Sequence, residues 1–123
     1  MHPLTDSFIK GRSKLKKIQG KYFDRFDKPR KACHYGAMYY GYYGDTDIDA
    51  GLVRMKADFP ELINFVPIPC EHSKEWGVGI GWISSILIHL NDVHDGRGGW
   101  TDQKVAEWLE TAFNQTAQKI EIV

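Results

Sequence analysis

Four side chains that can bind a metal ion occur between residues 70 and 94. Cys70 and His72 are separated by one residue, and His89 and His94 follow further along the chain. Thiolate sulfur and imidazole nitrogen are preferred zinc ligands, and four of them complete a tetrahedral site. The His89–His94 spacing is usual for zinc, whereas the Cys70–His72 spacing is shorter than the common one. The candidate zinc set is therefore Cys70, His72, His89 and His94.

A structural role for these histidines is the other interpretation, and it is the one we expect. His89 falls beside the apolar face of a predicted helix, where an imidazole can pack and form hydrogen bonds. His94 follows the end of that helix, in a stretch with three glycines. We therefore expect no metal and no cofactor, and in particular that His89 and His94 are not both ligands. Zinc bound by the four-residue set is the alternative.

Catalysis is a further possible use of the two cysteines. Cys33 or Cys70 would act as a nucleophile only with a histidine beside it as a base. No local signature of a cysteine-dependent enzyme surrounds either residue. We therefore do not expect an enzyme.

Two helices in the C-terminal half must position these groups. Apolar residues from Ile83 to Leu90 recur at helical spacing and predict a buried central helix that stops at Asn91-Asp92. Thr101 is a good N-cap for a second helix, and Asp102 suits its first turn. The chain ends in the alternating sequence "KIEIV", which predicts a short C-terminal strand or a frayed tail. The apolar face of the second helix is formed by Val105, Trp108, Leu109, Ala112 and Phe113.

The rest of the chain also favours helices. Patterns of apolar residues, caps and breakers predict helices over 6–19 and 50–57, a helical turn over 61–65 and a helix in "ACHYGAMYYGYYG". Pro60, Pro67 and Pro69 then prevent one long helix in this part of the chain and favour an extended connection. We predict a mainly α, compact single domain that spans 1–123 and contains about four or five helices.

Two stripes run along the "ACHYGAMYYGYYG" helix. One contains small residues, among them Gly36, Ala37 and Gly41, and it favours the close approach of another helix. The other contains tyrosines. At this spacing such rings usually belong to the core, but exposed rings would stack on nucleic-acid bases. The second stripe consists of Tyr35, Tyr39 and Tyr42.

Charge is distributed unevenly along a chain whose formal net charge is zero. Residues 1–31 contain ten Lys/Arg and three Asp, a net charge of +7, and residues 32–123 have a net charge of −7. Because the whole chain is neutral, we expect the basic segment to pack against the acidic remainder. The alternative is a basic arm for nucleic acid. Its candidate interaction surface comprises Lys14, Lys16, Lys17, Tyr35, Tyr39 and Tyr42.

The cellular location is predicted from features that would direct a chain out of the cytoplasm. The N-terminal residues lack the apolar run of a secretory signal, and the apolar stretch 78–90 is too short to cross a bilayer. Two cysteines without an export signal are expected to be reduced thiols. We therefore expect a cytoplasmic protein without a membrane partner.

Two segments resemble parts of small uncharacterised bacterial and phage-type proteins. "ACHYGAMYYG" is similar to their Ala-Cys-x-x-Gly-Ala segment, and "HLNDVH…GWTDQKVAEWLE" is similar to their C-terminal element. That element reads His-Leu-Asn-Asp-x-His, then Trp-Ser/Thr and Val-Ala-x-Trp. Some of these proteins have a Cys-x-x-Cys pair before the histidines, which implies a metal in them. Here the matching place reads "PCEH", so Cys70 fits and the second cysteine is absent.

Together these features predict a small binding or regulatory protein that acts through protein contacts. The resemblance implies a relation to phages or prophages, and it implies no activity. The alternative function is that of a zinc-stabilised nucleic-acid-binding module. It would combine the Cys/His set with the basic N-terminal segment and exposed tyrosines.

Overall fold

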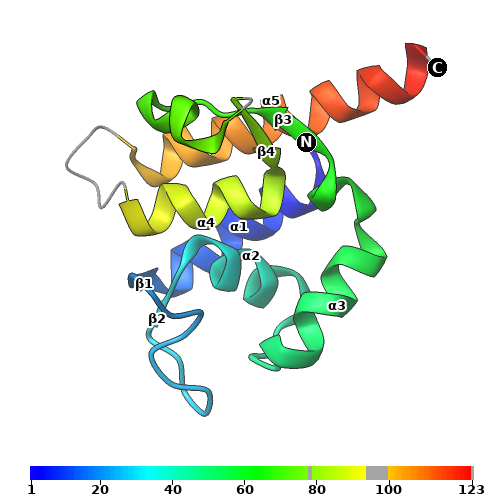
Figure 1. The fold of residues 1–123 in the computed structure, drawn as a ribbon. Helices are drawn as coiled ribbons and strands as arrows, with labels where there is room; N and C mark the ends of the chain where they lie inside the picture. Colours follow the sequence, from blue (N-terminus) through cyan, green and yellow to red (C-terminus); the bar gives the residue numbers. More distant parts are fainter. Residues whose placement is uncertain (78, 94–99, 123) are drawn as a thin grey trace.

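Helices α1 (Pro3–Lys14) and α2 (His34–Tyr43) approach one another so closely that their backbones nearly touch (Figure 1). A Cβ atom at Gly11 would lie 1.8 Å from the carbonyl oxygen of Ala37. One at Gly41 would lie 1.8 Å from the carbonyl oxygen of Ser7. No side chain fits at either position. The predicted close approach along the small-residue stripe is confirmed.

The N-terminal helix starts and ends earlier than the predicted range 6–19. It starts at Pro3, because Nδ1 of His2 accepts the N–H of Leu4 at 3.0 Å and so caps the helix. It ends at Lys14, and Leu15 is already extended. The predicted C-terminal end is wrong because the chain there pairs with a distant strand instead of continuing the helix.

That strand pairing joins β1 (Lys16–Lys17) and β2 (Lys31–Ala32) in parallel. The N–H of Lys16 donates to the carbonyl of Arg30 at 2.9 Å. After β2, the N-cap of α2 is Cys33, whose Sγ accepts the N–H of Gly36. The predicted helix over "ACHYGAMYYGYYG" is thereby confirmed.

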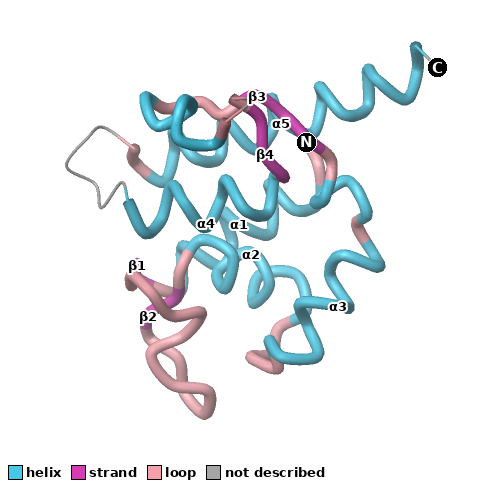
Figure 2. The backbone as a smooth tube through the Cα atoms, in the orientation of Figure 1, coloured by secondary structure: helices cyan, strands magenta, loops and turns pink. Residues whose placement is uncertain are grey.

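The middle of the chain alternates short helices and strands. The predicted helix over 50–57 and turn over 61–65 are confirmed, with small shifts of their ends. An antiparallel pair of strands, in which Phe65 faces Trp82, was not predicted. The prolines in and near the first strand made its sequence look like an irregular connection. Figure 2 shows the two small sheets on either side of the fourth α-helix. In order, the elements are α3 (Ile48–Asp58), the 3-10 helix η1 (Pro60–Ile63), β3 (Phe65–Pro67), the 3-10 helix η2 (Glu71–Trp76) and β4 (Ile80–Trp82).

Two longer helices, α4 (Ile83–Val93) and α5 (Asp102–Ile122), complete the fold. Both were predicted from their apolar periodicity. The expected cap of α5 is present: Oγ1 of Thr101 accepts the N–H of Lys104 at 3.2 Å. The prediction of a short C-terminal strand is wrong for residues 119–122, because α5 continues through Ile122.

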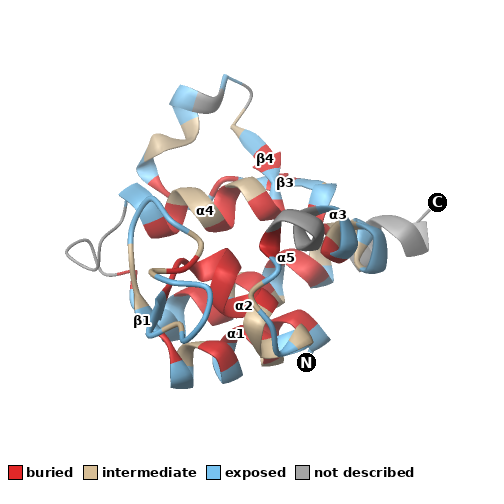
Figure 3. Ribbon diagram, turned by 90° about the horizontal axis from the view of Figure 1, so that it is seen from below, coloured by how far each residue is buried: buried red, intermediate tan, exposed pale blue. Residues whose placement is uncertain are grey.

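The core lies where α1, α2, α4 and α5 face one another, as Figure 3 shows by its buried segments. Its fully buried side chains include Phe8 of α1, Met38 of α2 and Leu87 of α4. Helix α5 contributes Val105 and Leu109 to this core, and its Trp108 is only partly buried.

The computed structural model describes residues 1–77, 79–93 and 100–122, without the side chains of 49–52, 76 and 116–122. In these residues five α-helices form a mainly helical, compact domain, as the sequence predicted. None of the described helices has the length and apolar character needed to cross a membrane.

Candidate metal centre

Three of the four candidate zinc ligands lie together. The Sγ atom of Cys70 is 3.3 Å from Nε2 of His89 and 3.7 Å from Nδ1 of His72. All three ligand atoms fall within 4.8 Å of one another. The two imidazole rings are nearly perpendicular, with their centroids 5.2 Å apart. This cluster joins residues that are separated by up to nineteen positions in the sequence.

The cluster is built where a hairpin connection meets a helix. Cys70 and His72 lie in the connection between β3 and β4, and His89 projects from α4. The hairpin is extended by one hydrogen bond beyond its strands, from the N–H of Ile68 to the carbonyl of Gly79 at 3.0 Å. Because α4 follows β4 without a loop, the helix remains beside the connection that holds the other two ligands.

The short spacing of Cys70 and His72 is accommodated by the local backbone. Cys70 is extended immediately before η2, and its carbonyl accepts the N–H of Ser73 at 3.3 Å. The chain therefore turns at once after Cys70 and brings His72 back towards its sulfur. From spacing alone, Cys70 and His72 looked like a poor pair of zinc ligands. The turn that brings them together cannot be inferred from the number of residues between them.

The distances agree with tetrahedral coordination of zinc. With Zn–S of about 2.3 Å and Zn–N of about 2.0 Å, a tetrahedral ion separates its sulfur and nitrogen ligands by about 3.5 Å. The two observed Sγ–N distances, 3.3 and 3.7 Å, lie on either side of that value. The distances from Sγ of Cys70 to the two imidazole nitrogens are therefore close to those that a single ion would need.

A hydrogen-bonded cluster without metal is the competing interpretation. The neutral thiol of Cys70 has one proton, so it can donate to only one of the two imidazoles. The other contact would then need an N–H donated to sulfur, which is a weak acceptor. Both contacts can thus form without metal, but one of them is weak, whereas a bound ion accounts for both Sγ–N distances.

The cluster of Cys70, His72 and His89 is partly buried and partly accessible to solvent. Cys70 is 9% exposed, and the side chain of His72 is 25% exposed. An ion therefore has a route to a cluster whose sulfur is shielded. Glu71, which the sequence does not mark as a functional residue, places Oε1 at 3.9 Å from Nδ1 of His72. Its only sequence signal was its position between two candidate ligands.

The fourth candidate ligand, His94, lies outside the described residues. The prediction that His89 and His94 are not both ligands therefore stays a prediction. The described residues supply three protein ligands, which leaves one tetrahedral position for a fourth group.

The second candidate surface is divided by the fold. Lys14 and Lys16 are exposed and Lys17 is half-buried. Tyr35 and Tyr39, by contrast, are fully buried in the core, so neither ring can belong to an interaction surface. The proposed exposed tyrosine surface is wrong at those two positions, because one side of α2 faces α1 and the opposite side faces other core elements. Tyr42 is 46% exposed.

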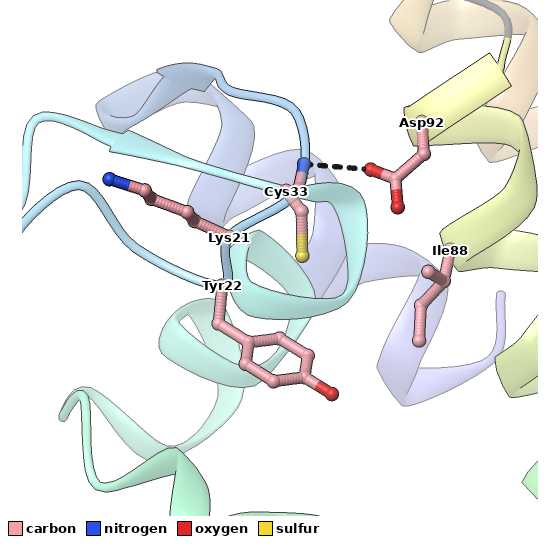
Figure 4. Close-up of a pocket in the computed structure, with 6 residues that line it drawn as sticks. Lys21, Tyr22, Cys33, Ile88 and Asp92 are labelled. Carbon is pink, nitrogen blue, oxygen red and sulfur yellow. Dashed lines mark hydrogen bonds between the residues drawn. The ribbon is translucent and has the colours of Figure 1, made fainter.

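Cys33 has a structural position. It caps α2 with its sulfur and is 3% exposed. Burial raises the pKa of the Cys33 thiol, so it stays protonated and is a weak nucleophile. It borders a cavity of about 190 Å³ with Tyr22, Ile88 and Asp92 (Figure 4). In that cavity Asp92 accepts the N–H of Gly20 at 3.0 Å, the dashed line in the figure.

Comparison of the chain with protein-family models, with curated proteins and with solved structures finds no match.

Proposed function

We propose that the chain is a small helical zinc-binding domain whose metal is held by Sγ of Cys70, Nδ1 of His72 and Nε2 of His89. The observation that supports this most directly is the pair of Sγ–N distances, 3.3 and 3.7 Å, which match those around one tetrahedral ion. Thiolate and imidazole favour zinc over calcium or magnesium, which prefer oxygen ligands.

The metal's role in this proposal is to stabilise the fold. In the described residues between β3 and β4, the short helix η2 is the only regular structure. A zinc ion would fasten this connection to α4, whose apolar face is part of the core. Because the ligands of the unfolded chain are not preorganised, the free energy of zinc binding adds to the free energy of folding.

Metal analysis of the purified protein tests the proposal, together with thermal unfolding before and after chelation. We expect one zinc per chain, a lower melting temperature after EDTA treatment and recovery with one equivalent of zinc. The sequence alone led to the opposite expectation. The observed convergence of three ligand atoms is the reason for the change.

Matched cysteine variants locate the site. Cys70→Ser should abolish stoichiometric zinc binding, and it should remove the sulfur-to-metal charge-transfer band of the cobalt-substituted protein. Cys33→Ser is the control, because it alters the other thiol and retains a capping oxygen for α2. Metal-free wild-type protein whose melting temperature does not change when zinc is added would contradict the proposal. His94→Ala measures whether residue 94 contributes a fourth ligand.

Binding of a protein partner is a second candidate function, favoured by the outward face of the β3–β4 pair. Phe65 and Trp82 face each other across the strands and are 51% and 40% exposed. Aromatic residues of this kind are common anchors at protein interfaces. This second function is tested by comparing the protein partners that bind to the wild type with those that bind to the double variant Phe65→Ser, Trp82→Ser. Val53→Ser is the control for loss of an exposed apolar side chain, since Val53 is 74% exposed.

A further inference from the structure

Residues 14–31 form a basic lobe that projects from the helices, at the blue-to-cyan end of the chain in Figure 1. The lobe contains eight Lys/Arg and two Asp, a net charge of +6. Seven of its basic side chains are exposed: Lys14, Lys16, Lys21, Arg25, Lys28, Arg30 and Lys31.

None of these seven side chains forms a salt bridge with another residue that the structure describes, although the charge of Arg25 acts on the neighbouring Asp24 carboxylate. The ion pairs of Lys and Arg between described residues are Lys10–Asp6, Arg12–Asp102 and Arg54–Asp45, and none involves those seven. Arg12 of the basic segment does pair with Asp102 of the acidic remainder, so the expectation that the segment packs against that remainder stays a prediction for the other cations. Their charge remains available to a partner.

Internal hydrogen bonds hold the lobe in one shape. Oδ1 of Asp24 accepts the N–H groups of Arg25, Arg30 and Lys31, each at 3.0 Å. The N–H of Asp24 donates to the carbonyl of Lys31 at 3.1 Å. The carboxylate is thus used inside the loop, and the cations around it are presented on an ordered backbone.

The base of the lobe is fastened to the core. Phe23 is 3% exposed, and the carboxylate of Asp92 in α4 accepts the N–H of Gly20. Figure 4 shows the side chain of Lys21 directed away from Asp92. Lys21 is therefore available on the outer side of the lobe, while Asp92 is committed to the backbone.

The tip of the lobe exposes an aromatic ring. Phe26 is 61% exposed, and it contacts the buried Phe23 ring edge-on at 5.9 Å. Its carbonyl accepts the hydroxyl of Thr46 at 2.7 Å, which fixes the tip against the connection between α2 and α3. The neighbouring Asp45 is partly neutralised by Arg54 at 3.7 Å and accepts the hydroxyl of Tyr39.

We propose that this lobe binds single-stranded nucleic acid, with its Lys and Arg side chains on the phosphates and Phe26 stacked on a base. Cations along a backbone track combined with an aromatic platform are the general means of binding single strands. Overall neutrality does not prevent this, because exposed charges are screened beyond about 10 Å at 0.1 M salt.

The composition of the lobe favours nucleic acid over an anionic membrane. Insertion into the membrane interface buries a broad apolar face beside the cations. Phe26 is the one large apolar side chain of the lobe that is strongly exposed among the described residues. A single ring suits stacking on one base, whereas it supplies little area for insertion among lipids.

Fluorescence anisotropy with a labelled oligothymidylate of about 20 nucleotides tests the proposal over salt concentrations of about 50 to 200 mM. We expect binding that weakens steeply with salt. The variant Lys28→Gln, Arg30→Gln, Lys31→Gln should bind at least about tenfold more weakly and show a log–log salt slope smaller by about 2. The control Lys56→Gln, Lys74→Gln, Lys104→Gln has the same net charge and should bind within about twofold of the wild type.

Two further measurements test the ring and the choice of ligand. Phe26→Ala should weaken binding about tenfold and Phe26→Tyr should not, because only an aromatic ring can stack. Equal losses in both triple variants, no effect of Phe26→Ala, or binding to phosphatidylserine vesicles without binding to the oligonucleotide would overturn the proposal. Zinc content, measured in every variant, should not change, so the result is independent of the metal site.

Discussion

The Nδ1 atom of His34 lies 2.8 Å from the Nη2 atom of Arg12, where α1 meets α2. A guanidinium group can only donate hydrogen bonds, so Nδ1 must accept and the imidazole must be neutral, with its proton on Nε2. The same Arg12 donates to the carbonyl of Ala32 at 2.9 Å, and the N–H of His34 donates to Oδ1 of Asn91 at 3.0 Å. This pair is therefore the centre of a polar network that joins three helices.

Acidification is expected to destabilise the protein through His34. Burial, and then the positive charges of Arg12 and Lys17, lowers the pKa of His34 from 6.5 to about 3. Between these values the unfolded chain binds a proton that the folded chain does not. Stability present above the unfolded pKa is therefore lost as the pH falls below it, at about 1.4 kcal/mol per pH unit.

Denaturant unfolding at about pH 7 and about pH 5 measures this loss, which should be about 2 kcal/mol from His34 alone. His34→Gln is the control, because its amide can still accept from Arg12 and does not titrate. The variant should lose clearly less stability than the wild type on acidification. An equal loss in both proteins would exclude His34 as its source.

Gly41→Ala should destabilise the α1–α2 contact. The added methyl group would lie 1.8 Å from the carbonyl oxygen of Ser7, so the helices would have to separate. We expect a loss of about 3 kcal/mol in the free energy of unfolding, at the upper end for overpacked cores. Lys14→Ala, on the exposed surface of α1, is the comparison and should change stability by less than about 0.5 kcal/mol. Similar values for the two variants would show that the helices are not packed this closely.

Asn91→Ala should cost about 3 kcal/mol, because it leaves buried polar groups without partners. The Asn91 side chain is fully buried and accepts from the N–H of His34, while its Nδ2 donates to the carbonyl of Ile18 at 2.8 Å. Asn91→Asp retains the acceptor and loses the donor. Its free energy of unfolding, measured by chemical denaturation, should therefore differ from that of the alanine variant and from that of the wild type. A cost below about 1 kcal/mol for the alanine variant would mean that water replaces these hydrogen bonds.

Thr101→Ala should lower the free energy of unfolding by about 1 kcal/mol through loss of the α5 cap. Thr101→Ser retains the hydroxyl and should be nearly neutral. Thermal or urea unfolding of the two variants measures the difference. If serine were as costly as alanine, the effect would come from packing of the threonine methyl group and not from the cap.

The sequence by itself determined the features that depend on neighbouring residues. The apolar periodicity from Ile83 to Leu90 specified α4, and Thr101 specified the start of α5. The small residues of α2 indicated that another helix packs closely against it, but they did not indicate which helix. Such features follow from backbone propensity and from the 3.6-residue repeat, which act within one or two turns.

Only the tertiary structure decided what depends on contacts between distant segments. Helix α1 ends at Lys14 because Lys16 pairs with a strand fifteen residues later, and Tyr35 and Tyr39 are buried because both sides of α2 are covered. Cys70 and His89 meet because a hairpin returns the chain directly into α4. Spacing along the chain does not define distances in space, so the convergence of the three ligands, and the exposure of the basic lobe, were decided by how the helices pack.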